Sequence, residues 1–232
     1  MSAPELRIVD DPAQVCADEL VAAARAGGHL VLTGGSTPKL AYEIAARTPE
    51  AFAGAKLWFG DDRCVGPDDE RSNYRMAKLA LLDPVAAAGV EIDFCRRILG
   101  ELGPDQGAED YERALAEHGA PPFSLILLGL GSDGHTASMF PGQSSLDERE
   151  RLVIGVEQAG LEPFVPRVTF TFPCIAQAGR VLVLATGAAK ADAVARAFAE
   201  NALPSRETPA SLLAEWAKSL TVLLDVDAAS RL

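Results

Sequence analysis

The chain has 232 residues, of which 48% are hydrophobic and 23% charged, and its formal net charge at pH 7 is −12. This size and hydrophobicity suit one sizeable core, so we expect a single domain over residues 1–232. The acidic charge argues against nucleic acid and anionic membranes as partners, because clustered Lys and Arg side chains bind both. A phosphorylated small molecule remains compatible, since a few backbone N–H groups and local cations recognise phosphate.

The sequence shows no sign of membrane insertion or secretion. It contains no uncharged apolar run of about eighteen residues, the length of a membrane-spanning helix, and its N-terminus lacks a signal-peptide pattern. We therefore expect a soluble, cytoplasmic protein. The four cysteines, Cys16, Cys64, Cys95 and Cys174, form no C-x-x-C pair, so neither a disulfide framework nor a zinc site is expected. They are interpreted as buried or half-buried residues.

Apolar runs and helical segments alternate along the chain. Strands are predicted at residues 6–9, 29–33, 56–59, 123–130, 167–172, 181–185 and 220–224. Helices are predicted at residues 12–26, 39–46, after a cap at Ser72, and at 105–118, 188–200 and 210–218. Such alternation implies right-handed crossovers and a mostly parallel sheet that helices cover on both faces. The predicted fold is a Rossmann-like α/β sandwich of three layers.

The first informative loop, at residues 33–38, follows the strand at 29–33 and opens a helix. Gly34 and Gly35 let a ligand approach the backbone, while Ser36 and Thr37 add hydroxyl donors beside the free N–H groups of the helix start. This pattern suits a phosphate. An ordinary strand-to-helix turn, with a Ser or Thr cap and Pro38 in the first helical position, is an equally open reading.

The second loop, at residues 60–65, carries two acids and a guanidinium at another strand end. Adjacent acids point in different directions, so we expect only one of Asp61 and Asp62 to enter the crevice, with Arg63 pairing with the other. A solvated turn is the alternative. An acid pair can also bind Mg²⁺, but no further convergent oxygens are marked by spacing, and we predict no metal.

The third loop, at residues 129–142, holds the strongest functional signal. The apolar strand at 123–130 ends in glycines, and Asp133 and His135 follow it two residues apart. The carboxyl ends of strands in an α/β sheet are where ligands bind. An Asp can fix the tautomer of a nearby imidazole and raise its basicity, so we interpret His135 as a general base. A structural histidine is the alternative.

Two further cations are candidates for binding a phosphate. Lys190 lies at a predicted helix start, where a cation is unfavourable unless an anion is also bound there. Arg167 heads the strand predicted at 167–172, and a guanidinium matches phosphate oxygens in a bidentate manner. Either residue could instead be an ordinary surface cation.

Taken in order, these segments resemble the bacterial 6-phosphogluconolactonase family, which is related to glucosamine-6-phosphate deaminases. The resemblance extends from about His29 to Leu224, nearly the whole chain, and its specificity lies in the joint order of the motifs. They are residues 32–38, 61–65 with 72–73, 129–142, 166–169, 187–191 and 209–213. The chain departs from the family where Asp62 replaces the usual Glu and where residues 175–177 replace an Asn-containing turn.

The resemblance implies metal-independent hydrolysis of 6-phospho-D-glucono-1,5-lactone to 6-phosphogluconate, in the oxidative pentose phosphate pathway, without a cofactor. His135 would act as the general base that takes a proton from water, and Asp133 and Asp61 would be the other catalytic residues. The resemblance carries phosphate binding to Arg167 and Lys190, helped by the backbone at residues 35–37 (Gly35, Ser36 and Thr37). It carries Arg63 and Asp61 to the sugar end.

Two other functions remain open from the sequence. A deaminase or isomerase acting on glucosamine 6-phosphate would share the phosphate site. Deaminases of this superfamily continue after the histidine with an Ile-Ala-Phe-Asn-Glu type of segment, whereas residues 136–141 are Thr-Ala-Ser-Met-Phe-Pro, the lactonase version. A non-catalytic sugar-phosphate sensor is the second alternative, and the intact Asp133 and His135 count against it. As for assembly, we expect a monomer or a weak homo-oligomer.

Overall fold

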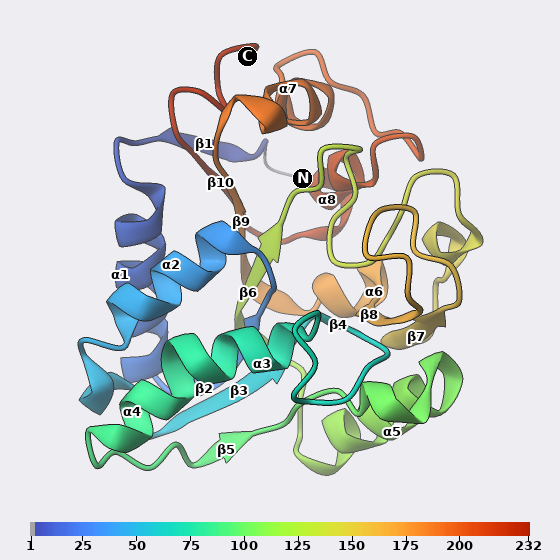
Figure 1. Cartoon of the computed structure of the whole chain (residues 1–232). Helices are drawn as coiled ribbons and strands as arrows, with labels where there is room; N and C mark the ends of the chain where they lie inside the picture. Colours follow the sequence, from blue (N-terminus) through green and yellow to red (C-terminus); the bar gives the residue numbers. More distant parts are fainter. Residues whose placement is uncertain (1–2) are drawn as a thin grey trace.

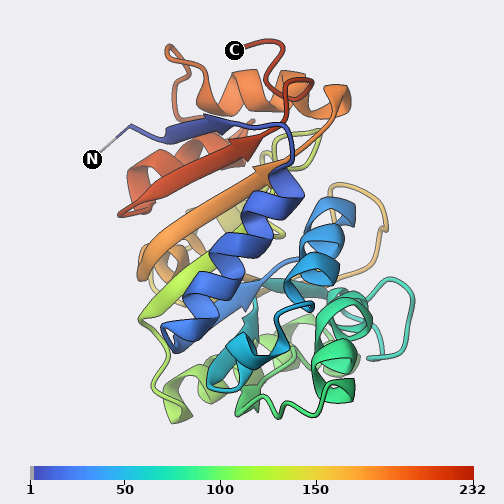
Figure 2. The same ribbon diagram turned by 90° about the vertical axis from the view of Figure 1, so that its left-hand side faces the viewer.

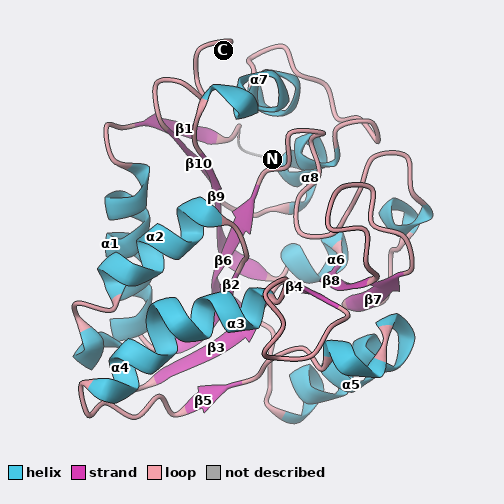
Figure 3. Ribbon diagram, in the orientation of Figure 1, coloured by secondary structure: helices cyan, strands magenta, loops and turns pink. Residues whose placement is uncertain are grey.

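The computed structural model describes residues 3–232 and is built on a seven-stranded parallel sheet (Figures 1 and 3). The strands lie in the order β1-β10-β9-β6-β2-β3-β5. Their bounds are β1 Glu5–Ile8, β2 Gly28–Leu32, β3 Ala55–Phe59, β5 Phe94–Cys95, β6 Phe123–Gly129, β9 Ala178–Ala185 and β10 Leu220–Leu224. The predicted central strand, β6, is the fourth of the seven, and most of its residues are buried.

Helices cover both faces of this sheet, which confirms the predicted three-layer sandwich. Helices α1, α2, α3 and α4 lie on one face, while α5, α6 and α8 lie on the other (Figures 1 and 2). The helices are α1 Pro12–Arg25, α2 Ser36–Ala45, α3 Asn73–Ala77, α4 Asp83–Ala87, α5 Pro104–Glu117, α6 Phe172–Ile175, α7 Ala191–Phe198 and α8 Leu213–Trp216. One π-helical turn, Lys78–Leu82, joins α3 to α4.

The strand order reverses direction next to β2. From β2 the chain continues outward through β3 and β5, and then returns to build β6, β9 and β10 on the other side. At such a switch point the loops after neighbouring strands diverge, and a crevice opens beyond their carboxyl ends. The three loops singled out in the sequence follow β2, β3 and β6, and Lys190 follows β9, so all four come to this edge of the sheet.

A second, three-stranded antiparallel sheet stands beside the first. Its strands are β4 (Asp61–Arg63), β8 (Arg167–Phe170) and β7 (Val153–Val156), in the order β4-β8-β7. The prediction of an irregular loop at Asp61–Arg63 was therefore wrong, as was the extension of the later strand to residue 172. A three-residue strand shows no periodicity, and its partner lies about a hundred residues away in the sequence.

Several element boundaries also differ from the prediction. Helix α2 begins at Ser36, three residues before the predicted start, because Gly35 with φ of 113° takes the cap position. Each of the last two predicted helices is shorter and opens with a 3₁₀ turn, Ala188–Lys190 before α7 and Pro209–Leu212 before α8. The cap at Ser72 is confirmed, since its hydroxyl accepts a hydrogen bond from the N–H group of Arg75.

Most buried apolar side chains, from Ala13 to Ala228, form one connected cluster. Within it Cys16 and Cys174 are buried, as expected, and Cys64 is half-buried. Cys95 is exposed, contrary to the expectation, because β5 is a two-residue strand at the edge of the sheet. All four cysteines are free thiols. Within residues 3–232 no helix has the length and apolar character needed to span a membrane.

A buried histidine lies at the amino end of the central strands. The indole Nε1 of Trp58 donates to His29 Nδ1 over 2.8 Å, so this ring nitrogen carries no proton. His29 is 9% exposed. Burial lowers the pKa of His29, and the nearby charges of Lys56 and His118 lower it further. Protonation of His29 would remove the acceptor of the Trp58 hydrogen bond.

We predict that acidification destabilises the protein through His29. Because its pKa is lower in the folded than in the unfolded chain, its stabilising contribution is present above about pH 6.5 and is lost below it. The test is urea unfolding of the wild type and of His29→Gln, a neutral acceptor, at about pH 7.5 and about pH 5.5. The variant should lose less stability between the two pH values. Equal losses in both proteins would contradict the prediction.

Candidate active site

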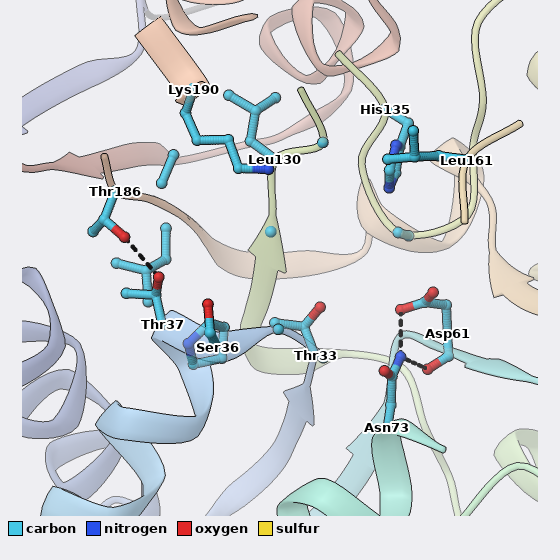
Figure 4. A pocket seen from close by; sticks show the side chains of 18 of the residues that line it. Thr33, Ser36, Thr37, Asp61, Asn73, Leu130, His135, Leu161, Thr186 and Lys190 are labelled. Atoms are coloured by element: carbon cyan, nitrogen blue, oxygen red, sulfur yellow. Dashed lines mark hydrogen bonds between the residues drawn. The ribbon is translucent and has the colours of Figure 1, made fainter. Parts of the chain in front are cut away.

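A pocket of about 300 Å³ lies beyond the carboxyl ends of β2, β3, β6 and β9 (Figure 4). Its walls come from the loops that follow these strands, and Leu161 and Glu162 add a further wall from the loop after β7. Among its lining residues are seven of those that the sequence singled out: Gly35, Ser36, Thr37, Asp61, Arg63, His135 and Lys190. The structure therefore brings together residues up to 155 positions apart, from Gly35 to Lys190.

Asp133 and His135 are in direct contact. His135 Nδ1 lies 2.6 Å from Asp133 Oδ1, and the same oxygen accepts the backbone N–H group of His135 over 3.1 Å. Gly131 closes the loop with a 2.8 Å bond to the His135 carbonyl. A Cβ atom on Gly131 would lie 2.1 Å from His135 Nδ1, so only glycine fits here. With Nδ1–H donated to the carboxylate, Nε2 is left with a free lone pair.

The charge state of Asp133 supports this arrangement. Burial raises the pKa of the Asp133 carboxyl, but the hydrogen bonds from His135 and its charge outweigh burial, so the pKa lies below its ordinary value. The imidazole ring packs against the Phe140 ring, with 4.7 Å between centroids, and Phe140 is 2% exposed. The ionised Asp133 and the buried Phe140 ring together hold the His135 imidazole in one position, as a proton acceptor requires.

Asp61 is the acid of the pair that enters the pocket. It is 6% exposed, and the Ser138 hydroxyl donates to its Oδ2 over 2.7 Å. Asn73 Nδ2 approaches Oδ1 at 3.3 Å and also donates to the Asp61 carbonyl at 3.0 Å (Figure 4). Ser138 itself is held by a bond from its N–H group to Thr169 Oγ1. Two donors from different elements therefore fix the Asp61 carboxylate.

Sequence reasoning did not assign these supporting roles. Asn73 and Ser138 appeared only within the family motifs, at residues 72–73 and 129–142. Both are almost completely buried, at 3% and 1% exposure. The sequence did show that polar residues lie in or near the predicted site loops. Which acid each of them contacts depends on the antiparallel sheet, which the sequence did not reveal.

Asp62 has a structural role at the start of α3. It accepts hydrogen bonds from Ser72 Oγ and from the N–H groups of Asn73 and Tyr74, at 3.1, 2.7 and 3.0 Å. Burial raises the pKa of Asp62, although these hydrogen bonds oppose the shift. The expectation that one acid enters the crevice is confirmed. The expected pairing of the Arg63 side chain with the other acid is wrong, because Arg63 Nη1 donates to the Arg71 carbonyl.

The loop after β2 is anchored by a buried tyrosine. The Tyr42 hydroxyl, on α2, accepts the Thr33 N–H group and donates to the Thr33 carbonyl, both over 2.9 Å. Because Gly35 provides no side-chain cap, the N–H groups of the first turn of α2 are left for a ligand. The Thr37 hydroxyl also lies 2.6 Å from that of Thr186, which joins this loop to the one after β9 (Figure 4).

Lys190 completes this end of the pocket. Its side chain extends from the start of α7 towards Leu130, on the side of the pocket opposite His135 and Asp61 (Figure 4). Burial lowers the pKa of Lys190, and the negative charge of Asp133 opposes that shift. A half-buried ammonium beside free N–H groups is an electrostatically favourable place for a phosphate.

Arg167 lies apart from Lys190. It does not line the 300 Å³ pocket but a smaller cavity next to it, which Asp61, Arg63 and His135 also line. The sequence had grouped Arg167 with Lys190 because both were candidate cations for a phosphate, to which the family resemblance also assigned them. The antiparallel pairing of β8 with β4 instead places Arg167 beside Arg63. Among residues 3–232, no group of three or more His, Cys, Asp and Glu side chains could hold a metal ion.

Comparison with known proteins places this geometry in a family. The family described as glucosamine-6-phosphate isomerases/6-phosphogluconolactonase matches residues 7–222. The chain belongs to this family. Within it, a 6-phosphogluconolactonase of Synechocystis is 39% identical over 86% of this chain and 85% of its own length. A 6-phosphogluconolactonase of Mycobacterium leprae is 34% identical over 90% of this chain and 87% of its own length.

The same family supplies solved structures. The 6-phosphogluconolactonase from Trypanosoma cruzi superposes with a TM-score of 0.84 at 30% identity, covering 100% of this chain and 98% of that one. The agreement over the whole length indicates that the sandwich and its loops are those of the glucosamine-6-phosphate isomerase/6-phosphogluconolactonase family. The resemblance deduced from the motifs is thereby confirmed.

We predict that Tyr42→Phe weakens both the fold and the pocket. It leaves the buried N–H and C=O groups of Thr33 without their partner, at a cost of about 1–3 kcal/mol in the free energy of unfolding. The measurement is urea unfolding, together with binding of a sugar phosphate. Tyr74→Phe is the matched control, since the Tyr74 hydroxyl makes no hydrogen bond to the part of the chain described here. Equal stability of the two variants would contradict the anchoring role.

Proposed function

We propose that this protein is a 6-phosphogluconolactonase, which hydrolyses 6-phospho-D-glucono-1,5-lactone to 6-phosphogluconate in the oxidative pentose phosphate pathway. The observation that carries the assignment is the contact of Asp133 with His135, which lines a pocket whose other wall presents Lys190 and the start of α2. The family membership and the names of the curated relatives agree with it.

His135 acts on water in this reaction. The water oxygen forms a bond to the lactone C1 while His135 Nε2 takes a proton from that water, and the negative charge gathers on the former carbonyl oxygen. The bond from C1 to the ring oxygen then breaks, and the ring oxygen leaves with the electron pair and takes the proton back from His135. The carboxylic acid so formed loses its own proton to solvent. Asp133 binds Nδ1–H of the His135 imidazole and so keeps the tautomer in which Nε2 is free to accept the proton.

The other residues orient the sugar phosphate. Gly35, Ser36 and Thr37 offer the phosphate N–H groups and hydroxyls, and Lys190 offers it a charge. Asp61 faces the sugar end, where its fixed carboxylate accepts hydrogen bonds from hydroxyl groups or orients water. Holding the lactone against His135 contributes to the rate because it replaces a chance encounter by a fixed geometry.

The deaminase alternative finds less support at His135. Ring opening of an amino sugar uses a glutamate beside the histidine in the related deaminases, whereas here the ring of Phe140 packs against the imidazole. Lactone hydrolysis needs one base and stabilisation of an oxyanion. A small-molecule substrate, rather than nucleic acid or a membrane, also agrees with the net charge of −12. We further propose a cytoplasmic monomer or weak homo-oligomer.

We predict that His135→Ala lowers kcat for the lactone by about 10²- to 10⁴-fold, the usual contribution of a general base, with little change in ligand affinity. The lactone is generated in situ from glucose 6-phosphate, and its hydrolysis is compared with the spontaneous rate. His118→Ala, in a histidine at the far end of the sheet, is the control and should keep wild-type kcat. Wild-type turnover in His135→Ala would remove His135 from the base role, and no acceleration by the wild type would refute the function. Release of ammonia from glucosamine 6-phosphate would instead establish the deaminase.

We predict that Lys190→Gln raises KM for the lactone about tenfold or more, since a charge-assisted bond to phosphate contributes about 1.5–3 kcal/mol. The value of kcat should change much less, because Lys190 lies at the end of the pocket away from His135. Lys78→Gln, which removes an exposed lysine paired with Asp83, is the control and should leave KM unchanged. An unchanged KM in Lys190→Gln would place the phosphate elsewhere.

A further inference from the structure

A second cavity of about 40 Å³ adjoins the pocket on the His135 side. His135, Asp61 and Arg63 line both spaces, whereas Arg167 lines only the smaller one and Lys190 only the larger. At about 10–15 Å³ for each water-sized group, the cavity has room for about three oxygen atoms. The smaller cavity therefore adjoins the pocket at His135 and lies away from Lys190.

This cavity contains buried cationic groups that lack partners. Arg167 is 2% exposed, and its Nη2 donates to the Pro163 carbonyl over 2.6 Å. Its Nε and Nη1 are buried and have no hydrogen-bond partner within residues 3–232, and the same holds for Arg63 Nε. A buried donor without a partner is costly, and more so when it is charged. The protein alone leaves this cost unrelieved.

The neighbouring carboxylates do not relieve it, and Glu162, which also lines the cavity, forms no hydrogen bond or ion pair within residues 3–232. Both oxygens of Asp61 are engaged, Oδ2 by Ser138 and Oδ1 by Asn73, so neither forms a hydrogen bond with Arg167. Burial and the charge of Arg63 lower the pKa of Arg167 to about 10, which leaves the guanidinium charged at neutral pH. A planar guanidinium with free adjacent N–H groups matches the two oxygens of a carboxylate.

We propose that this cavity is a subsite for the C1 end of the ligand, in which Arg167 and Arg63 bind the product carboxylate and the oxyanion that precedes it. The inference rests on the proposed function, because His135 must act at C1 and the cavity adjoins His135. It gives the ligand a direction in the site, with its phosphate at Lys190 and the loop after β2 and its carboxylate at Arg167. The two arginines then bind the carboxylate of the ligand, whereas Lys190 binds its phosphate.

The experiment compares two ligands that differ only at C1. 6-Phosphogluconate carries a carboxylate there, whereas glucitol 6-phosphate has the same phosphate and a neutral CH₂OH group. Titration calorimetry on the whole protein should show that the wild type binds 6-phosphogluconate about tenfold or more tightly than glucitol 6-phosphate. In Arg167→Gln this ratio should fall to about one to threefold, with the affinity for glucitol 6-phosphate unchanged. Arg167→Lys, which keeps the charge but not the fork, should give an intermediate ratio.

Lys190→Gln is the matched control, because it should weaken both ligands equally and preserve their ratio. If Arg167→Gln instead weakens both ligands equally, Arg167 binds the phosphate and the proposal is overturned. If it weakens neither, only water occupies the cavity and the proposal is overturned as well. Arg63→Gln provides a second variant with the same expected loss of ratio if Arg167→Gln does not fold. A wild type that hydrolyses the lactone but shows no ligand preference would refute the subsite alone, whereas absence of hydrolysis would refute the function.

Discussion

The common direction of the strands in the main sheet is the constraint on which the site depends. Hydrogen-bonded register pairs Leu32 with Phe59 and Gly129 with Leu184, so β2, β3, β6 and β9 end at one edge. The loop after each strand then contributes one component of the pocket: the start of α2, the fixed acid Asp61, the imidazole of His135 and the cation Lys190. Because the strands are buried in one core, the loops start from rigid positions, which is what catalysis by positioning requires.

The loop that carries His135 is fixed from both sides. Within the loop, Gly131 and Asp133 hold His135 by its carbonyl and its Nδ1. From outside, the N–H group of Ala210 donates to the Gly134 carbonyl over 2.9 Å, which ties the loop to the segment before α8. The family motif at residues 209–213 thus has a mechanical role, although it contributes nothing to the lining of the pocket.

The sequence predicted the features that depend on residues close together in the chain, and missed those that depend on residues far apart. Apolar runs identified the strands, and glycines at their ends located the loops, so the parallel sheet and the place of His135 could be deduced. The sheet of β4, β8 and β7 could not, because its strands have three or four residues and β4 pairs with β8 across about a hundred positions. Its absence from the prediction led to one further error, the expected pairing of the Arg63 side chain with an acid, and left the position of Arg167 beside Arg63 unforeseen.

The pocket presents the cationic side chains of Arg63 and Lys190 although the chain carries a net charge of −12. Two carboxylates at the site have partners inside the protein, since Asp133 accepts from His135 and Asp61 from Ser138 and Asn73, whereas Glu162, which also lines the pocket, forms no hydrogen bond within residues 3–232. Each of these hydrogen bonds stabilises the negative charge of a carboxylate by a donor of the protein itself. The guanidinium groups, in contrast, keep buried nitrogens without partners among residues 3–232. Local pairing, rather than net charge, therefore determines what the pocket can bind, because interactions between exposed charges beyond about 8–10 Å are largely screened.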